Sequence, residues 1–244
     1  MGNKKIEASY YTLSKGWKTD LIVNVPIEDK KYERIQWPDE TVINYFIGRF
    51  ENEAEKSERA LKLLFANKPS GYSDDDYMYI KVSMLNDIYS THLSNFEKDG
   101  MVSILSKYNE SILSNTYSKC LVQNICSDCK KQIKKEPYSF VTKYCSHQRE
   151  DLYPIFDRYV VTMLRWYRDM RIAADYNDFD FDELALKSSA GNYNQFRDAI
   201  KSFKDLFDDK YTFKQIDMFL WSAGKNYFPI YVPEDCIPGK KAKY

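Results

Sequence analysis

An amine and a carboxylate between residues 138 and 160 could act together on a sugar carbon. Lys143 falls on a short, partly apolar predicted helix, where burial would favour the neutral amine that acts as a nucleophile. Asp157 comes fourteen residues later, at the predicted start of an amphipathic helix. A carboxylate there could stabilise positive charge on an attacked sugar. Two plainer interpretations stay open, in which Asp157 caps its helix and Lys143 is a surface lysine with a covered stem.

Cysteine and histidine spacing raises a zinc site as a second possibility. Cys126 and Cys129 form a C-x-x-C pair, and Cys145 and His147 follow. Three thiolates and an imidazole could hold zinc, but a C-x-H second half is irregular for a zinc knuckle. We therefore predict no metal and no other cofactor, and reduced thiols. The sequence also lacks glycine-rich phosphate loops and a G-x-S-x-G elbow, which excludes the commonest nucleotide-binding and serine hydrolase classes.

Basic residues cluster in one segment of a chain whose net charge is zero. Residues 118–149 hold seven lysines and arginines against two acidic residues. Such a segment can attract a polyanion, and it can equally be an ordinary solvated face. On the first interpretation the DNA-contacting residues are Lys130, Lys131, Lys134 and Lys135.

Apolar spacing predicts an all-α fold. Residues 42–65, 78–93, 156–170, 196–207 and 213–227 place apolar side chains three or four positions apart, and only 8 Gly and 8 Pro interrupt the chain. Ser73 and the Thr212-x-x-Gln215 capping box mark helix starts. We expect a globular multi-helix bundle of one or two subdomains, with an N-terminal extension (1–37), a helical domain (38–230) and an irregular tail (231–244). Residues 21–26 are expected to be extended.

The chain shows no features of a secreted or membrane protein. Residues 1–5 are polar, and no apolar region follows that would make a signal peptide. The longest apolar stretches fall well short of the ~20 residues of a transmembrane helix. We predict a cytoplasmic protein without a membrane partner.

Residues 142–160, which contain Lys143 and Asp157, resemble the helix-hairpin-helix DNA glycosylase superfamily, and its 8-oxoguanine branch in particular. The likeness rests on Thr142-Lys143 and on the segment PIFDRYV at residues 154–160. The family has a catalytic lysine after a G-x-G-x-K turn and a catalytic aspartate in V-D-x-x-V, so the resemblance implies these roles for Lys143 and Asp157. Residues 136–140 replace the glycine-rich turn here. The whole chain also resembles uncharacterised bacterial proteins, through segments such as residues 85–91 and 220–225.

Two functions of different class follow from these features. One is a DNA-binding protein with a glycosylase-like fold that excises a damaged or modified base in DNA repair. The alternative is a non-catalytic helical module whose protein partner covers a tyrosine-rich surface. Aromatic residues near the candidate site, such as Tyr89 and Phe156, could stack on a base or belong to the core.

Overall fold

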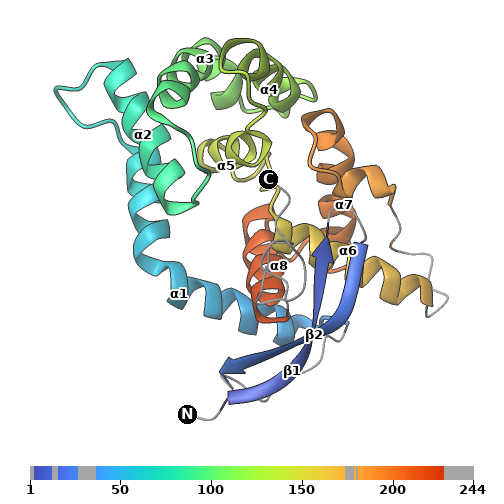
Figure 1. Ribbon diagram of the computed structural model, residues 1–244. Coiled ribbons are helices and arrows are strands. Elements are labelled where there is room, and N and C mark those ends of the chain that lie inside the picture. The colour runs from blue at the N-terminus through green and yellow to red at the C-terminus, as the bar shows by residue number, and fades with distance from the viewer. Residues whose placement is uncertain (1–2, 13–15, 27–36, 174–178, 180, 228–244) are drawn as a thin grey trace.

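The computed structural model of the protein describes residues 3–12, 16–26, 37–173, 179 and 181–227. In these residues the chain forms eight α-helices, two short 3-10 helices and one β-hairpin (Figure 1). The predicted all-α, multi-helix bundle is confirmed. Its helices are α1 (Glu40–Ala66), α2 (Asp74–Ile88), α3 (Asn95–Leu113), α4 (Leu121–Gln132), α5 (Tyr138–Gln148), α6 (Arg158–Ala173), α7 (Tyr193–Asp205) and α8 (Phe213–Tyr227), with 3-10 helices η1 (Glu183–Leu186) and η2 (Ala190–Asn192) between α6 and α7.

Side-chain caps begin several of these helices where the sequence predicts them. The Ser73 hydroxyl accepts from the backbone N–H of Asp76, whose carboxylate accepts in return at the start of α2. Thr212 and Gln215 make the same reciprocal pair before α8. Each pair satisfies backbone donors that a helix leaves unbonded in its first turn. The starts of α2 and α8 are therefore encoded locally.

The N-terminal residues add a hairpin to the helices. Strand β1 (Asn3–Thr12) pairs antiparallel with β2 (Gly16–Pro26), and Ile6 lies opposite Val23. The extended conformation predicted for residues 21–26 is confirmed. Strand β1 was not predicted, although Ile6, Ala8 and Tyr10 alternate with polar residues. The first half of β2 was not predicted because Trp17 is its only apolar residue.

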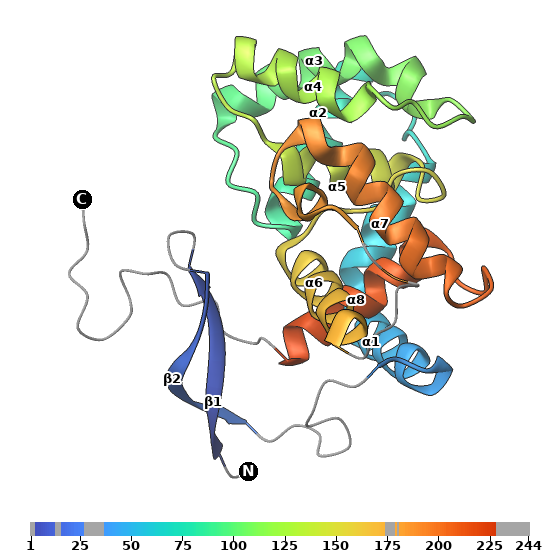
Figure 2. The ribbon, with the colours of Figure 1, turned by 90° about the vertical axis from the view of Figure 1, so that its right-hand side faces the viewer.

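Helix α1 takes part in two groups of helices. Helices α2, α3 and α4 pack around α5, while α6 and α7 pack with α8, and α1 contacts both α5 and α8 (Figures 1 and 2). Buried aromatic rings fill the second group, where Tyr167 stacks on Phe219 with 6.1 Å between ring centroids. Gly224 allows α8 to approach α6, because a Cβ there would lie 2.7 Å from the Cβ of Tyr159.

The end of α2 differs from the prediction in a way that matters for the site. We expected Tyr89 and Leu93 to continue one helical face, but α2 ends at Ile88. The Asn86 side chain accepts from the Leu93 N–H (2.7 Å) and from the Thr91 hydroxyl (2.9 Å), and this local bonding replaces the next helical turn. Tyr89 is consequently the C-cap of α2, where its side chain turns toward α5.

Two further predictions concern the ends and the surroundings of the chain. The predicted tail, residues 231–244, lies outside the described residues. None of the described helices combines the length and the apolar character needed to cross a membrane.

Candidate functional site

The Lys143 amine is buried within α5 and bonded to two oxygens. The residue is 4% exposed, and its Nζ donates to Ser139 Oγ at 2.7 Å and to Asp157 Oδ2 at 3.3 Å. Ser139 lies one helical turn before Lys143, and its hydroxyl donates to the Phe156 carbonyl at 3.2 Å. A buried ammonium needs such partners, since an unpaired one would be strongly destabilising. Lys143 is therefore not a surface lysine with a covered stem.

Asp157 uses its two carboxylate oxygens for two different purposes. Oδ1 accepts from the backbone N–H of Tyr159 at 2.9 Å and so caps α6, while Oδ2 faces Lys143. One geometry is therefore compatible with both interpretations of Asp157, as a helix cap and as a carboxylate beside Lys143. The Thr142 hydroxyl contributes to the placement, because it accepts from the Phe156 N–H at 3.1 Å. This bond ties the residue before Asp157 directly to α5.

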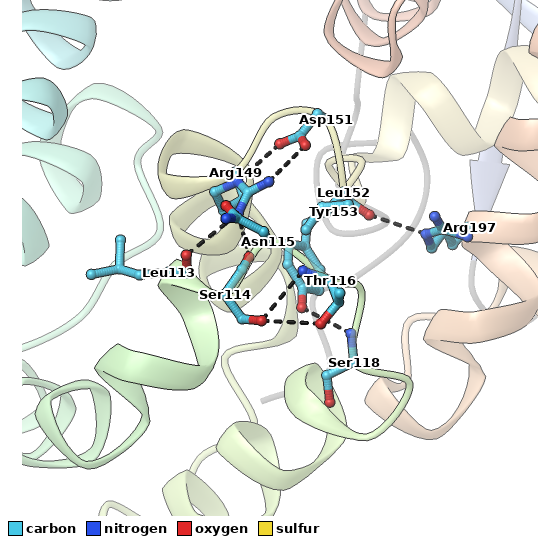
Figure 3. A network of polar contacts seen from close by, with 10 residues as sticks. All are labelled: Leu113, Ser114, Asn115, Thr116, Ser118, Arg149, Asp151, Leu152, Tyr153 and Arg197. Atoms are coloured by element: carbon cyan, nitrogen blue, oxygen red, sulfur yellow. Dashed lines mark hydrogen bonds and ion pairs between the residues drawn. The ribbon is translucent and has the colours of Figure 1, made fainter.

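The connection between α5 and α6 is also held by a polar network around Arg149 (Figure 3). The Arg149 guanidinium pairs with the Asp151 carboxylate at 2.8 Å and donates to the Ser114 carbonyl at the end of α3. The Tyr153 hydroxyl accepts from the Ser118 N–H at 3.2 Å, and Arg197 of α7 donates to the Leu152 carbonyl at 3.0 Å. The segment that carries Asp157 is therefore fixed by contacts from α3, α7 and the residues before α4.

A second polar chain runs beside Lys143. The Tyr89 hydroxyl donates to Glu58 Oε1 at 3.0 Å and lies 2.9 Å from His147 Nε2. Glu58 Oε2 in turn pairs with the Lys214 Nζ at 2.9 Å. The Lys143 Nζ lies 5.1 Å from the centre of the Tyr89 ring. Side chains from α1, α5, α8 and the end of α2 thus meet at one place.

Burial and charge set the protonation of this chain. Burial raises the pKa of Glu58, but Lys214, His147 and Tyr89 more than offset that effect, and the pKa lies below its ordinary value. Burial lowers the pKa of His147 to about 4, and the nearby Lys214 ammonium contributes. Burial also raises the pKa of Tyr89 well above 10. At neutral pH this chain of polar contacts therefore consists of an ionised Glu58, a neutral Tyr89 and a neutral His147.

Asp217 on α8 completes the group. It is 6% exposed, and its Oδ1 has no hydrogen-bond partner among the described residues. Burial raises its pKa to about 7; Lys214 opposes this rise, and the carboxylates of Asp157 and Glu58 add to it. We call the whole set the Lys143 cluster, which comprises Glu58, Tyr89, Ser139, Lys143, His147, Asp157, Lys214 and Asp217.

Sequence reasoning identified Lys143 and Asp157 but missed most of the cluster. Glu58 and Lys214 lie far apart along the chain, and no local pattern connects them. Asp217 did leave a signal, because it falls at helical spacing among the apolar residues Phe213, Ile216 and Leu220 and is buried with them. A carboxylate on the apolar face of a helix is unusual and marks a place to look for function.

The four lysines proposed to contact DNA lie at the end of α4 and in the turn before α5. Lys130, Lys131 and Lys134 are exposed. Lys131 pairs with Asp128 at 3.4 Å, and Lys135 pairs with Glu97 at 3.3 Å. Part of the positive charge on this surface is therefore balanced by neighbouring carboxylates.

The residues considered for zinc do not form a metal centre within the described part of the chain. Cys126, Cys129 and Cys145 are buried, and burial raises the pKa of the Cys129 and Cys145 thiols to about 12. Among the described residues, no group of three or more potential metal ligands comes together. The imidazole of His147 instead packs against the rings of Phe65 and Tyr89.

The fold and site define an all-α protein with a buried lysine, a carboxylate and a polar chain between its helices. Residues 42–152 match the family model HI_0787_N, described as an N-terminal domain. The chain is also 32% identical over 92 residues to an uncharacterized protein of Haemophilus influenzae. That alignment covers 38% of this chain and 39% of the relative, so the match spans about two fifths of either protein. No solved structure matches the chain.

The matched region contains some residues of the Lys143 cluster and ends before the others. Glu58, Tyr89 and Lys143 lie within residues 42–152, whereas Asp157 and Asp217 follow it. Neither the family description nor the name of the relative assigns an activity, so the function is inferred from the chemistry of the cluster.

Proposed function

We propose that the protein binds DNA and excises a damaged or modified base, with Lys143 as the nucleophile and Asp157 as its electrostatic partner. The observation that carries the proposal is the buried pair itself, in which Lys143 Nζ and Asp157 Oδ2 are 3.3 Å apart. An amine nucleophile beside a carboxylate suits a reaction that develops positive charge on a sugar.

The proposed chemistry begins when Lys143 gives a proton to the Asp157 carboxylate, which lies 3.3 Å away. Its nitrogen lone pair then forms a bond to C1′ of the deoxyribose, and the glycosidic bond breaks with its electron pair passing to the base. The base leaves with the proton that Asp157 took from Lys143, which returns Asp157 to its charged form. Ring opening converts this hemiaminal ether into a Schiff base, with the ring oxygen taking a proton and the amine losing one. Asp157 stabilises the cationic sugar while the glycosidic bond breaks.

Two features of the fold support a DNA partner. Helices α4 and α5 are joined by residues 133–137, so that Lys143 lies on the second of two consecutive helices with a short connection. Lys130 and Lys134 are exposed on the first helix and in the turn. Lysines at these positions could contact phosphates next to a base that has been rotated out of the duplex.

Borohydride trapping tests the proposed reaction. Wild-type protein is mixed with duplexes that carry single lesions or an abasic site, and borohydride reduces the Schiff base to a stable amine. We expect a covalent adduct at Lys143, loss of the adduct in Lys143→Ala, and slower base release in Asp157→Asn. Lys107→Ala is the matched control, since Lys107 forms an ion pair with Asp128 at 2.6 Å on the surface.

DNA affinity provides an independent measurement. Charge reversal at Lys130 and Lys134 should weaken binding to all sequences and lower the salt dependence, by roughly 0.9 in the logarithmic slope for each phosphate that the protein no longer neutralises. Reversal at the exposed Lys56 and Lys62 of α1 serves as the control. Absence of both binding and adducts at low salt would favour the alternative, a non-catalytic helical module with a protein partner.

A further inference from the structure

We propose that Tyr89 is a positioning residue that holds the Lys143 amine against its ring, in an orientation maintained by Glu58 and His147. The inference rests on the proposed function, in which Lys143 is the nucleophile. It adds a second layer to the site, because it assigns the polar chain beside Lys143 a role in that reaction.

The contact geometry around the amine leads to this assignment. An ammonium group has three N–H donors. Ser139 and Asp157 accept two of them, and the Tyr89 ring lies on a further side with its centre 5.1 Å from Nζ. A cation at this distance is attracted by the electron-rich face of the ring. The ring thus limits where the amine can move.

The Tyr89 ring is itself held through its hydroxyl group. A phenol has one proton, and the ionised Glu58 carboxylate, 3.0 Å away, is the stronger acceptor for it. The Tyr89 oxygen must then accept the second hydrogen bond, so His147 donates from Nε2 over 2.9 Å. Because the low pKa of His147 keeps its ring neutral, this bond selects the Nε2–H tautomer.

Each partner of Tyr89 is also anchored. Lys214 pairs with the other oxygen of Glu58, and the His147 ring packs against Phe65 with centroids 5.3 Å apart. Helices α1, α5 and α8 therefore cooperate to fix one ring beside one amine.

Nuclear magnetic resonance tests the arrangement without DNA. Protons on the Lys143 ε-carbon should be shifted upfield by the Tyr89 ring current, with the assignment made by Lys143→Arg. The chain has only two histidines, so ¹⁵N spectra of His147 can be read with His92 as an internal reference. In Tyr89→Phe the upfield shift should shrink and the His147 tautomer should no longer be fixed. In Tyr89→Leu the shift should disappear.

Single-turnover trapping on DNA tests the functional consequence. Tyr89→Phe should form the Lys143 adduct about tenfold more slowly, while the DNA dissociation constant changes less than twofold, because only the alignment of the nucleophile is impaired. Tyr108→Phe is the matched control. Tyr108 also donates to a carboxylate, Asp128 at 3.0 Å, and has a lysine amine 5.0 Å from its ring centre, but it lies outside the Lys143 cluster.

The two measurements separate failure of this inference from failure of the proposed function. If the wild-type protein forms adducts and Tyr89→Phe matches it in rate and in Lys143 chemical shift, the positioning role is refuted while the glycosylase reaction stands. If no DNA is trapped, the proposed function fails, and the Lys143 and His147 spectra alone decide whether Tyr89 holds the amine. A folded Tyr89→Leu variant with an unchanged Lys143 signal would overturn the inference.

Discussion

Replacing Asp217 by asparagine should remove a pH-dependent loss of stability from this protein. The Asp217 side chain is 6% exposed, and one of its oxygens has no partner among the described residues. Asparagine has nearly the same shape and cannot ionise, so the variant mimics the protonated acid at every pH. The substitution therefore isolates the effect of burying this charge.

The direction of the effect follows from the two pKa values. In the unfolded chain Asp217 loses its proton near the ordinary aspartate value of 3.8, whereas in the folded protein burial raises the pKa to about 7. Between these values the unfolded state binds fewer protons, and stability falls as pH rises. Below pH 4 both states are protonated, and above pH 7 the loss is complete. A difference of about three pH units corresponds to roughly 4 kcal/mol in the free energy of unfolding.

Urea unfolding, followed by tryptophan fluorescence from pH 4 to pH 8, measures this difference. We expect Asp217→Asn and the wild type to be similar at pH 4 and the variant to be more stable at pH 8. Asp128→Asn is the control, because hydrogen bonds from Lys107 and Tyr108 hold the pKa of this half-buried carboxyl below its ordinary value. Its contribution is lost as pH falls, which is the opposite sign.

The prediction is refuted if the free energy of unfolding changes with pH in the same way for the wild type and for Asp217→Asn. If the wild type and Asp217→Asn differ by the same free energy at pH 4, 6 and 8, then Asp217 ionises normally in the folded state. The account of a buried, partly unsatisfied carboxyl in the Lys143 cluster would then be wrong. A changed slope with urea would instead show that the substitution alters the unfolded or native state itself.

Two further predictions concern the packing around the site, and both are measured by urea unfolding. Thr142→Val keeps the side-chain shape but leaves the buried Phe156 N–H without its acceptor, and should cost about 1–2 kcal/mol; an unchanged midpoint would contradict this role. Gly224→Ala should destabilise by about 1–3 kcal/mol, because the new Cβ meets Tyr159. Gly48→Ala on α1 meets nothing within 4 Å and should stabilise by up to about 1 kcal/mol, so equal effects at the two glycines would contradict the predicted clash.

The helices could be predicted because their signals are local. Apolar spacing and side-chain caps act within a few residues. The helix starts at Ser73 and Thr212 can therefore be predicted without knowledge of the fold. The end of α2 was mispredicted for the same reason. The hydrogen bonds from Asn86 to residues 91 and 93 compete with helix formation, and this competition cannot be detected from apolar periodicity.

The same distinction between local and long-range signals applies to the candidate site. Residue types and order alone singled out Lys143 on one helix and Asp157 at the start of the next. The 3.3 Å between their charged groups, the burial of the amine and the approach of Glu58, Lys214 and Asp217 depend on how α1, α5, α6 and α8 pack. Helix formation is encoded over a few neighbouring residues, whereas the protonation of a buried group depends on solvent exclusion and on charges that only the folded chain brings together.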